Sequence, residues 1–113
     1  MVDTVIDWAQ VDELRADMGD AFPDVVKVFI QEVEEALASL TAAAADATTL
    51  AETLHFLKGA ALNLGFSQFA DACATAENDA HAGQTETIDL DAIRALYASS
   101  LKEFQIGLAQ RAA

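Results

Sequence analysis

Residues 47–65 read ATTLAETLHFLKGAALNLG, and apolar side chains recur in this stretch every three or four positions. That period is typical of an amphipathic helix, so we expect a helix from about Ala47 to Asn63. Asp46 is suited to cap its start, and Gly65 allows the chain to turn after its end. The buried stripe of this helix is expected to consist of Leu50, Leu54, Leu57, Ala61 and Leu64.

Two helices are expected before this stretch. The first spans about Trp8 to Met18, with Asp7 as its N-cap. The second begins directly after Asp20, its expected cap, and ends in the alanine run at residues 42–45. The apolar face of the first helix is expected to consist of Trp8, Val11, Leu14 and Met18.

Two further helices are expected after it. One starts at Ser67, which we expect as its cap, and runs to about His81. The other follows Asp89 and runs to about Ala109. Because the loops are short, neighbouring helices should be antiparallel. The sequence therefore predicts an all-α fold, an antiparallel up-down four-helix bundle with an additional short N-terminal helix packed across one end.

The length and charge of the chain limit its class. Its 113 residues suit one domain, placed at residues 1–113 with a bundle core at about 20–109. The formal net charge is −13 and the six Lys and Arg residues are scattered, so we expect neither nucleic-acid binding nor docking to an anionic membrane. We expect no signal peptide in residues 1–12 and no membrane-spanning segment. Cys73 is the single cysteine, which excludes an internal disulfide and suits a cytoplasmic location.

His55 is the first candidate for chemistry. It lies opposite the apolar stripe of its helix, so its ring should face solvent. A neutral imidazole nitrogen is a good nucleophile near neutral pH, and Lys58 lies one turn further on the same face, where it can offset phosphoryl charge. Gly59 costs about 1 kcal/mol in a helix interior relative to Ala, so it should serve a purpose, such as clearing space. The alternative is a surface histidine with a lysine nearby by chance.

Glu77 strengthens the case for a site. It lies near the centre of the apolar face of the helix that starts at Ser67. A buried carboxylate needs a donor or a cation, and the nearest candidates on the adjacent helix are His55 and Lys58. A carboxylate on one ring nitrogen fixes the tautomer and frees the other nitrogen to attack. The alternative is a glutamate at the rim of the interface that reaches water.

The segment from Leu54 to Gly65 resembles the signature of the histidine-containing phosphotransfer (HPt) family, His-x-Leu-Lys-Gly followed by Leu-Gly. Cys73 and Glu77 resemble the Cys-x-x-Leu-Glu segment of the family, with Ala76 in place of the leucine. The resemblance covers roughly residues 20–109. Two positions depart from it: Ala60 stands where many members carry Ser or Thr, and His81 stands where some carry arginine.

The resemblance implies a carrier in a two-component phosphorelay. The aspartyl phosphate of a receiver domain, with Mg²⁺ on the receiver, presents the phosphoryl group, and His55 accepts it through Nε2 and passes it to another receiver. Lys58 then contacts the phosphoryl oxygens and Glu77 the other ring nitrogen. Partners would be receiver domains of response regulators or a hybrid histidine kinase, and the chain itself would bind no cofactor or metal. The residues expected to line the docking surface are Ala51, Glu52, Gly59 and Leu62.

Other functions remain open at this stage. A helical module could dock to a receiver or kinase without being phosphorylated, and Ala60 with the Leu62 surface favours that alternative. A hydrolase that uses His55 as a base lacks an evident nucleophile and oxyanion hole. An ATP-using enzyme is not expected, because no P-loop or kinase glycine loop is present. We expect a monomer, and a free-standing protein rather than the phosphoacceptor domain of a larger kinase.

Overall fold

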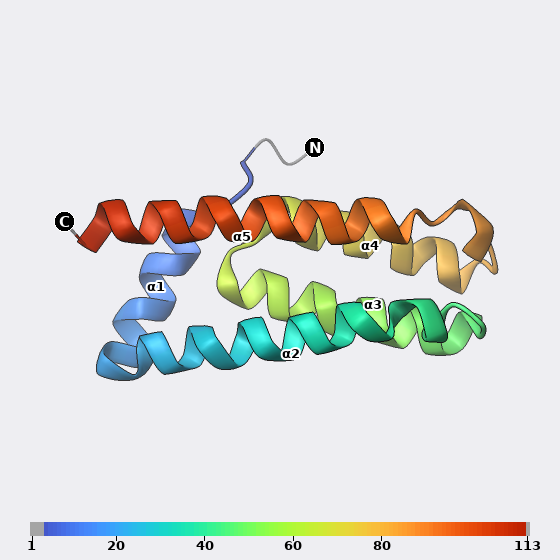
Figure 1. The fold of residues 1–113 in the computed structure, drawn as a ribbon, viewed down its shortest axis with the longest axis horizontal. Helices are drawn as coiled ribbons and strands as arrows, with labels where there is room; N and C mark the ends of the chain where they lie inside the picture. Colours follow the sequence, from blue (N-terminus) through green and yellow to red (C-terminus); the bar gives the residue numbers. More distant parts are fainter. Residues whose placement is uncertain (1–3, 113) are drawn as a thin grey trace.

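The computed structural model describes residues 4–112, and every regular element in this range is a helix. The α-helices are α1 (Trp8–Met18), α2 (Phe22–Ala43), α3 (Ala47–Leu64), α4 (Ser67–His81) and α5 (Leu90–Ala112). Two short 3₁₀ turns, η1 (Gly19–Ala21) and η2 (Thr85–Thr87), lie between them. Helices α2 to α5 run up and down as an antiparallel bundle, and α1 crosses one end of it (Figure 1). The predicted fold class is confirmed; residues 1–3 and 113 of the expected domain lie outside the described residues.

Three aspartates cap helices, and two of them, Asp7 and Asp46, do so as the sequence predicts. The side chain of Asp7 accepts a hydrogen bond from the backbone N–H of Gln10 at the start of α1. Asp46 accepts one from Thr49 at the start of α3. Asp89 accepts one from the third residue after it, at the start of α5. These contacts satisfy backbone donors that a helix leaves unpaired at its first turn.

The turn after α3 fixes the position of α1. Gly65 has φ +83°, a left-handed conformation that glycine adopts at little cost. Its carbonyl accepts a hydrogen bond from the backbone N–H of Asp7 at 2.7 Å. The side-chain amide of Gln10 donates to the carbonyl of Asn63 at 3.1 Å. The start of α1 is therefore tied to the end of α3, which places α1 across the end of the bundle.

Several expected details are wrong. Asp20 does not cap α2, because it lies within the 3₁₀ turn η1 and lacks the extended backbone of an N-cap; Ala21 holds that position without a side-chain hydrogen bond. Ser67 is the first residue of α4 rather than its cap, which is Phe66, a buried side chain. Met18 is 39% exposed, because α1 ends there beyond the reach of the core.

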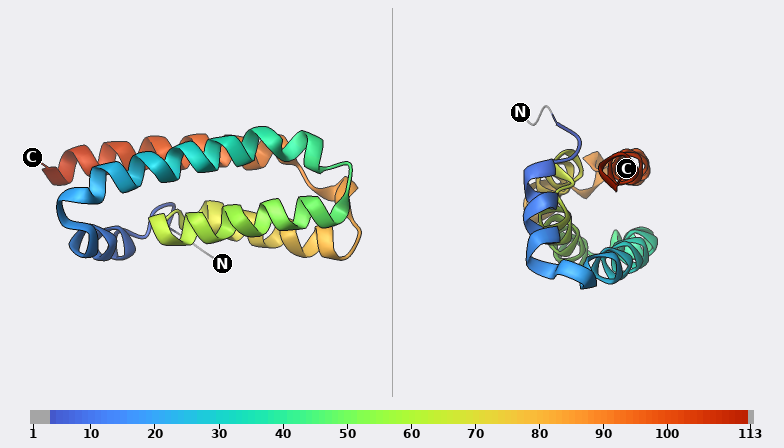
Figure 2. Two further views of the ribbon diagram at one scale, coloured as in Figure 1. Left: turned by 90° about the horizontal axis from the view of Figure 1, so that it is seen from below. Right: turned by 90° about the vertical axis from the view of Figure 1, so that its left-hand side faces the viewer.

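Helices α3 and α4 pack against each other more extensively than any other pair. Both views of Figure 2 show them side by side along the bundle. Small side chains let two helix backbones approach closely, and both helices bury several alanines. The buried alanines of the two helices are Ala51, Ala60, Ala61, Ala70, Ala76 and Ala80. This close approach brings side chains of α3 within hydrogen-bonding distance of side chains of α4.

An aromatic cluster closes the other side of the core. The ring of Phe66 contacts the rings of Phe104 and Tyr97, at centroid distances of 5.2 and 6.1 Å. Trp8 of α1 stacks on Phe104 at 6.0 Å, which joins α1 to α5. Each such pair adds about 1 kcal/mol beyond the burial of its area. Among the described helices, none combines the length and apolarity needed to span a membrane.

Candidate functional site

His55 projects from the middle of α3 into solvent. Its side chain is 69% exposed, whereas every member of the predicted apolar stripe of α3 is buried. The ring faces outward because the stripe occupies the opposite side of a helix with 3.6 residues per turn. The position follows directly from the period of the sequence.

Glu77 of α4 contacts two basic groups of α3 with its two carboxylate oxygens. Oε2 lies 3.0 Å from Nδ1 of His55, and Oε1 lies 2.9 Å from Nζ of Lys58. The Glu77 side chain is only 11% exposed, so the pairing offsets the cost of burying a charge. The contact with Lys58 is an ion pair whose angles do not meet the geometry of a hydrogen bond, because Oε1 has no hydrogen-bond partner within the described residues. The alternative that Glu77 lies at the rim of the helix interface and reaches bulk water is therefore wrong.

The electrostatics of Glu77 keep it ionised. The ammonium group of Lys58 is the main cause that lowers the pKa of the Glu77 carboxyl group. Burial acts in the opposite direction, and the hydrogen bond with His55 lowers this pKa further. At neutral pH, the ring of His55 therefore faces a carboxylate rather than a carboxylic acid.

A carboxylate at Nδ1 determines how the His55 ring is used. An ionised carboxylate only accepts hydrogen bonds, so the neutral ring places its proton on Nδ1 and its lone pair on Nε2. Nε2 makes no hydrogen bond with any residue from 4 to 112. The arrangement thus presents an oriented, exposed nucleophile with a cation, Lys58, one turn away.

The predicted docking residues have different environments. Glu52, Gly59 and Leu62 are exposed, and the Leu62 side chain is 56% exposed. A methyl group added at Gly59 would meet no atom within 4 Å, so no contact inside the chain demands glycine there. Ala51 is only 2% exposed and its expected exposure is wrong, because α4 covers the flank of α3 on which it lies. Phe56, 44% exposed beside His55, was missed, although its position outside the apolar stripe indicated it.

One hollow is lined by His55 and a second by Lys58. One of about 300 Å³ is lined by Ala51, Glu52, His55, Glu77 and His81. The other, of about 320 Å³ and mostly apolar, is lined by Lys58, Leu62, Ser67, Ala70, Asp71 and Ala74. A further group that sequence reasoning left out of the site, His81, lies 3.5 Å through Nε2 from Oε2 of Glu77. Its spacing of four residues from Glu77 on one helix was the available signal.

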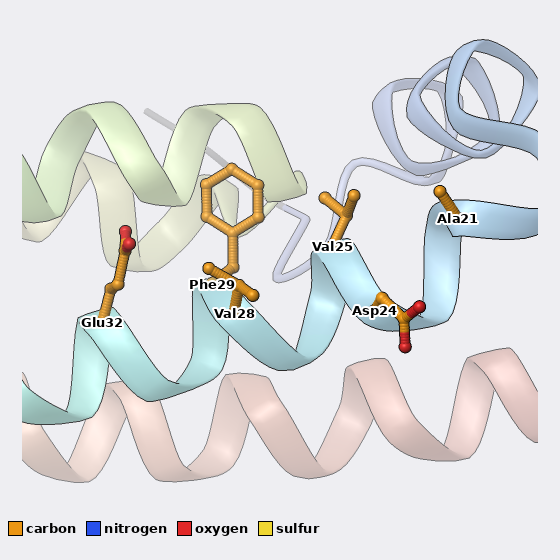
Figure 3. A pocket seen from close by; sticks show the side chains of 6 residues that line it. All are labelled: Ala21, Asp24, Val25, Val28, Phe29 and Glu32. Carbon is orange, nitrogen blue, oxygen red and sulfur yellow. The ribbon is translucent and has the colours of Figure 1, made fainter.

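A third hollow lies on α2, outside the cluster formed by His55, Lys58, Glu77 and His81. Its volume is about 270 Å³, and it is lined by Ala21, Asp24, Val25, Val28, Phe29 and Glu32 (Figure 3). No imidazole, thiol or ammonium group lines it. In the part of the chain that the structure describes, no set of three or more His, Cys, Asp or Glu residues is arranged to hold a metal ion.

Comparison with known proteins gives one match. The family model described as Hpt domain matches residues 24–105, well over half of the chain. This range contains all of α3 and α4, and therefore His55, Lys58 and Glu77. No curated protein matches the chain, and no solved structure matches it either.

Proposed function

The chain belongs to the Hpt domain family of histidine phosphotransfer carriers in phosphorelays, and on this premise we propose that His55 is its phosphoacceptor. The ring is proposed to accept a phosphoryl group from the aspartyl phosphate of a receiver domain and to pass it to another receiver. The observation that carries this proposal is the 3.0 Å contact between Nδ1 of His55 and the buried carboxylate of Glu77, with Nε2 left in solvent. The protein is a carrier with no turnover of its own in this scheme.

The proposed transfer conserves its atoms and charges. The lone pair of Nε2 attacks phosphorus, so the bond between nitrogen and phosphorus forms while the bond from phosphorus to the aspartyl oxygen breaks. The aspartate leaves as a carboxylate. The proton on Nδ1 stays on the ring, and Glu77 accepts its hydrogen bond while the ring carries positive charge. Transfer to the second receiver reverses these changes.

Lys58 is proposed to offset the charge of the phosphoryl oxygens. Its ammonium group is already held beside the site by Glu77, at 2.9 Å. Phosphoryl transfer depends largely on positioning and charge stabilisation. Ala60, which is buried and has no hydroxyl group, offers the phosphoryl group nothing, so Lys58 carries this role without its help.

The partner is proposed to dock around His55, on the exposed surface formed by Phe56, Gly59 and Leu62. Gly59 supports this proposal, because it costs helix stability without any internal contact that needs it. The receiver would bring its own Mg²⁺. We place the carrier in the cytoplasm as a monomer: its single thiol suits a reducing compartment, and one His55 surface per chain is sufficient for transfer.

Labelling by a phosphorylated receiver tests the proposal. The protein should gain acid-labile, base-stable phosphate, and the His55→Gln variant should gain none while keeping its helical circular dichroism. The chain has two histidines, so His81→Gln is the matched control and should become labelled, whatever its rate. Undiminished labelling of the His55→Gln variant would exclude His55 as the acceptor.

A second candidate is a docking module that regulates a receiver or kinase without accepting phosphate. Two observations favour it: Ala60 supplies no hydroxyl group, and Phe56 and Leu62 expose apolar area for a partner. This candidate predicts receiver binding that survives His55→Ala, together with failure of every receiver of the source organism to transfer phosphate.

A further inference from the structure

His81 brings a third basic group to the carboxylate of Glu77. Its Nε2 lies 3.5 Å from Oε2, the same oxygen that contacts Nδ1 of His55. The other oxygen, Oε1, faces Lys58. The His81 side chain is 65% exposed, so it can exchange protons with water freely, whereas the Glu77 side chain is 11% exposed.

Acidic side chains and helix carbonyl groups lie around His81. In the hollow that it lines, the other ionisable groups are Glu52 and His55 from α3 and Glu77 from α4 itself. His81 is also the last residue of α4, where unpaired carbonyl groups attract positive charge.

The remaining charged groups near α4 face other hollows. Asp79 and Asp89 line one between α4 and α5, and Glu86 of η2 lines another with Arg94. Asp71 lies in the hollow beside Lys58. Of the acidic groups around His81, Glu77 is the one that lies within 4 Å of its ring nitrogen.

We propose that His81 is a positioning residue that competes with His55 for Oε2 of Glu77. When His81 gains a proton, it donates to Oε2 and weakens the bond that orients the His55 ring. The consequence for phosphoryl transfer rests on the function proposed above, whereas the competition itself does not.

The geometry places both rings on one oxygen of Glu77. At 3.5 Å the pair is at the outer limit of a hydrogen bond, and a charged imidazole draws closer to a carboxylate than a neutral one. Glu77 cannot turn into water to serve both rings, since its side chain is buried and Oε1 is engaged by Lys58. A charged donor from His81 therefore shares Oε2 with His55. The oxygen can accept two hydrogen bonds, but the charged donor draws its electron density and weakens the hydrogen bond from Nδ1–H of His55.

Nuclear magnetic resonance tests the competition without any phosphate. In the wild-type protein, the side-chain carboxyl ¹³C shift of Glu77 and the ring ¹⁵N shifts of His55 should each show a component that follows the titration of His81. In His81→Gln this component should vanish. In His81→Lys the Glu77 shift should resemble that of the wild type with His81 protonated, at every pH between 6 and 8. Shifts of Glu77 that ignore the titration of His81 would overturn the proposal.

Rates of phosphoryl acceptance test the consequence. At each pH, the rates of the wild type and of His81→Lys are divided by the rate of His81→Gln. The wild-type ratio should be near one at high pH and should fall at low pH toward the ratio of His81→Lys. That ratio should correspond to slowing of about two- to tenfold, the worth of one shared hydrogen bond. Dividing by the His81→Gln rate removes the pH dependence that both proteins share, such as the protonation of His55 itself.

Glu86→Gln is the matched control for net charge, because it changes the charge by one unit in a different hollow, and its rate divided by the wild-type rate should stay flat with pH. A wild-type ratio that is flat across the same pH range would overturn the effect on rate. If no variant accepts phosphate but the resonance shifts behave as expected, the phosphoacceptor function fails and the competition stands.

Discussion

The Nδ1 atom of His55 lies 3.0 Å from Oε2 of Glu77, a residue 22 positions later on the adjacent helix. The imidazole is mostly exposed and the carboxylate is mostly buried. A fixed acceptor therefore holds a ring whose other nitrogen is free to react. This relationship depends on the close packing of α3 against α4.

Removing the Glu77 carboxylate should slow phosphoryl acceptance. In Glu77→Ala, the His55 ring loses its only partner on Nδ1 among the described residues, and a hydrogen bond to a charged group is worth about 1.5–3 kcal/mol. We expect a rate at least about tenfold lower, and a smaller loss in Glu77→Gln, whose amide oxygen still accepts. Rapid-quench measurement of transfer from a phosphorylated receiver checks this. Asp79→Asn, on the same helix but outside the cluster, should transfer normally; a normal rate in Glu77→Ala would contradict the prediction.

The Glu77 interaction should also contribute to stability in a pH-dependent way. The pKa of Glu77 is lowered in the folded protein, chiefly by Lys58, so folding favours the ionised form. The contribution is therefore fully present above the pKa of an ordinary glutamate and is lost as the pH falls through the lower, folded-state pKa. Urea unfolding should show wild type more stable than Glu77→Gln at pH 7, by about 1 kcal/mol, with the difference shrinking below the ordinary carboxyl range. A difference that does not change with pH would show that the charge is not involved.

Replacing Lys58 should change the titration of Glu77. Because Lys58 is the largest cause of the lowered pKa, Lys58→Met should raise the pKa of the Glu77 carboxyl group. A carboxyl ¹³C titration measures this directly. Lys102→Met, at an exposed position of α5, is the control and should leave the Glu77 titration unchanged. We also expect slower transfer in Lys58→Met, by about tenfold, because the phosphoryl oxygens lose a nearby cation. An unmoved Glu77 midpoint would mean that the ion pair is not formed in solution.

The thiol of Cys73 should be unreactive until the protein unfolds. Its side chain is fully buried, and burial followed by the charge of Glu77 raises the pKa of the thiol to about 12. Only the thiolate reacts with aromatic disulfide reagents, so the folded protein should react far more slowly than free cysteine at pH 8. The reaction rate should rise with urea in parallel with the loss of helical circular dichroism. Rapid labelling in the absence of urea would show that the Cys73 face of α4 is not packed into the core in solution.

Two glycines of α3 and its turn should respond in opposite directions to alanine. Gly65 has φ +83°, and an added Cβ would lie 2.8 Å from the carbonyl oxygen of Asp7, so Gly65→Ala should destabilise the fold by at least about 1 kcal/mol. Gly59 is helical with open space around it, so Gly59→Ala should stabilise by about 0.5–1 kcal/mol. Thermal unfolding measures both effects. If Gly59 serves docking as proposed, the more stable variant should bind a receiver more weakly.

Much of the helical framework was predictable from local sequence. The apolar period of residues 47–65 determined α3 and the outward direction of His55, because each residue of a helix advances by a fixed angle. Asp7 and Asp46 indicated where their helices begin, because an N-cap side chain accepts its hydrogen bond from the first turn of its own helix. The burial of Glu77 and its candidate donors, His55 and Lys58, followed from the apolar face on which it lies, together with the short loop between α3 and α4.

Other features were decided only by tertiary structure. The sequence gives angles around each helix, but the distance between helices depends on the side chains that separate them. Buried alanines bring α3 and α4 so close that Ala51 is covered, although its angle suggested exposure. The same close approach brings Oε2 of Glu77 within reach of His55. His81 faces this oxygen too, so both rings lie near one acceptor. Spacing between helices is a property of the whole packed core, and no local pattern encodes it.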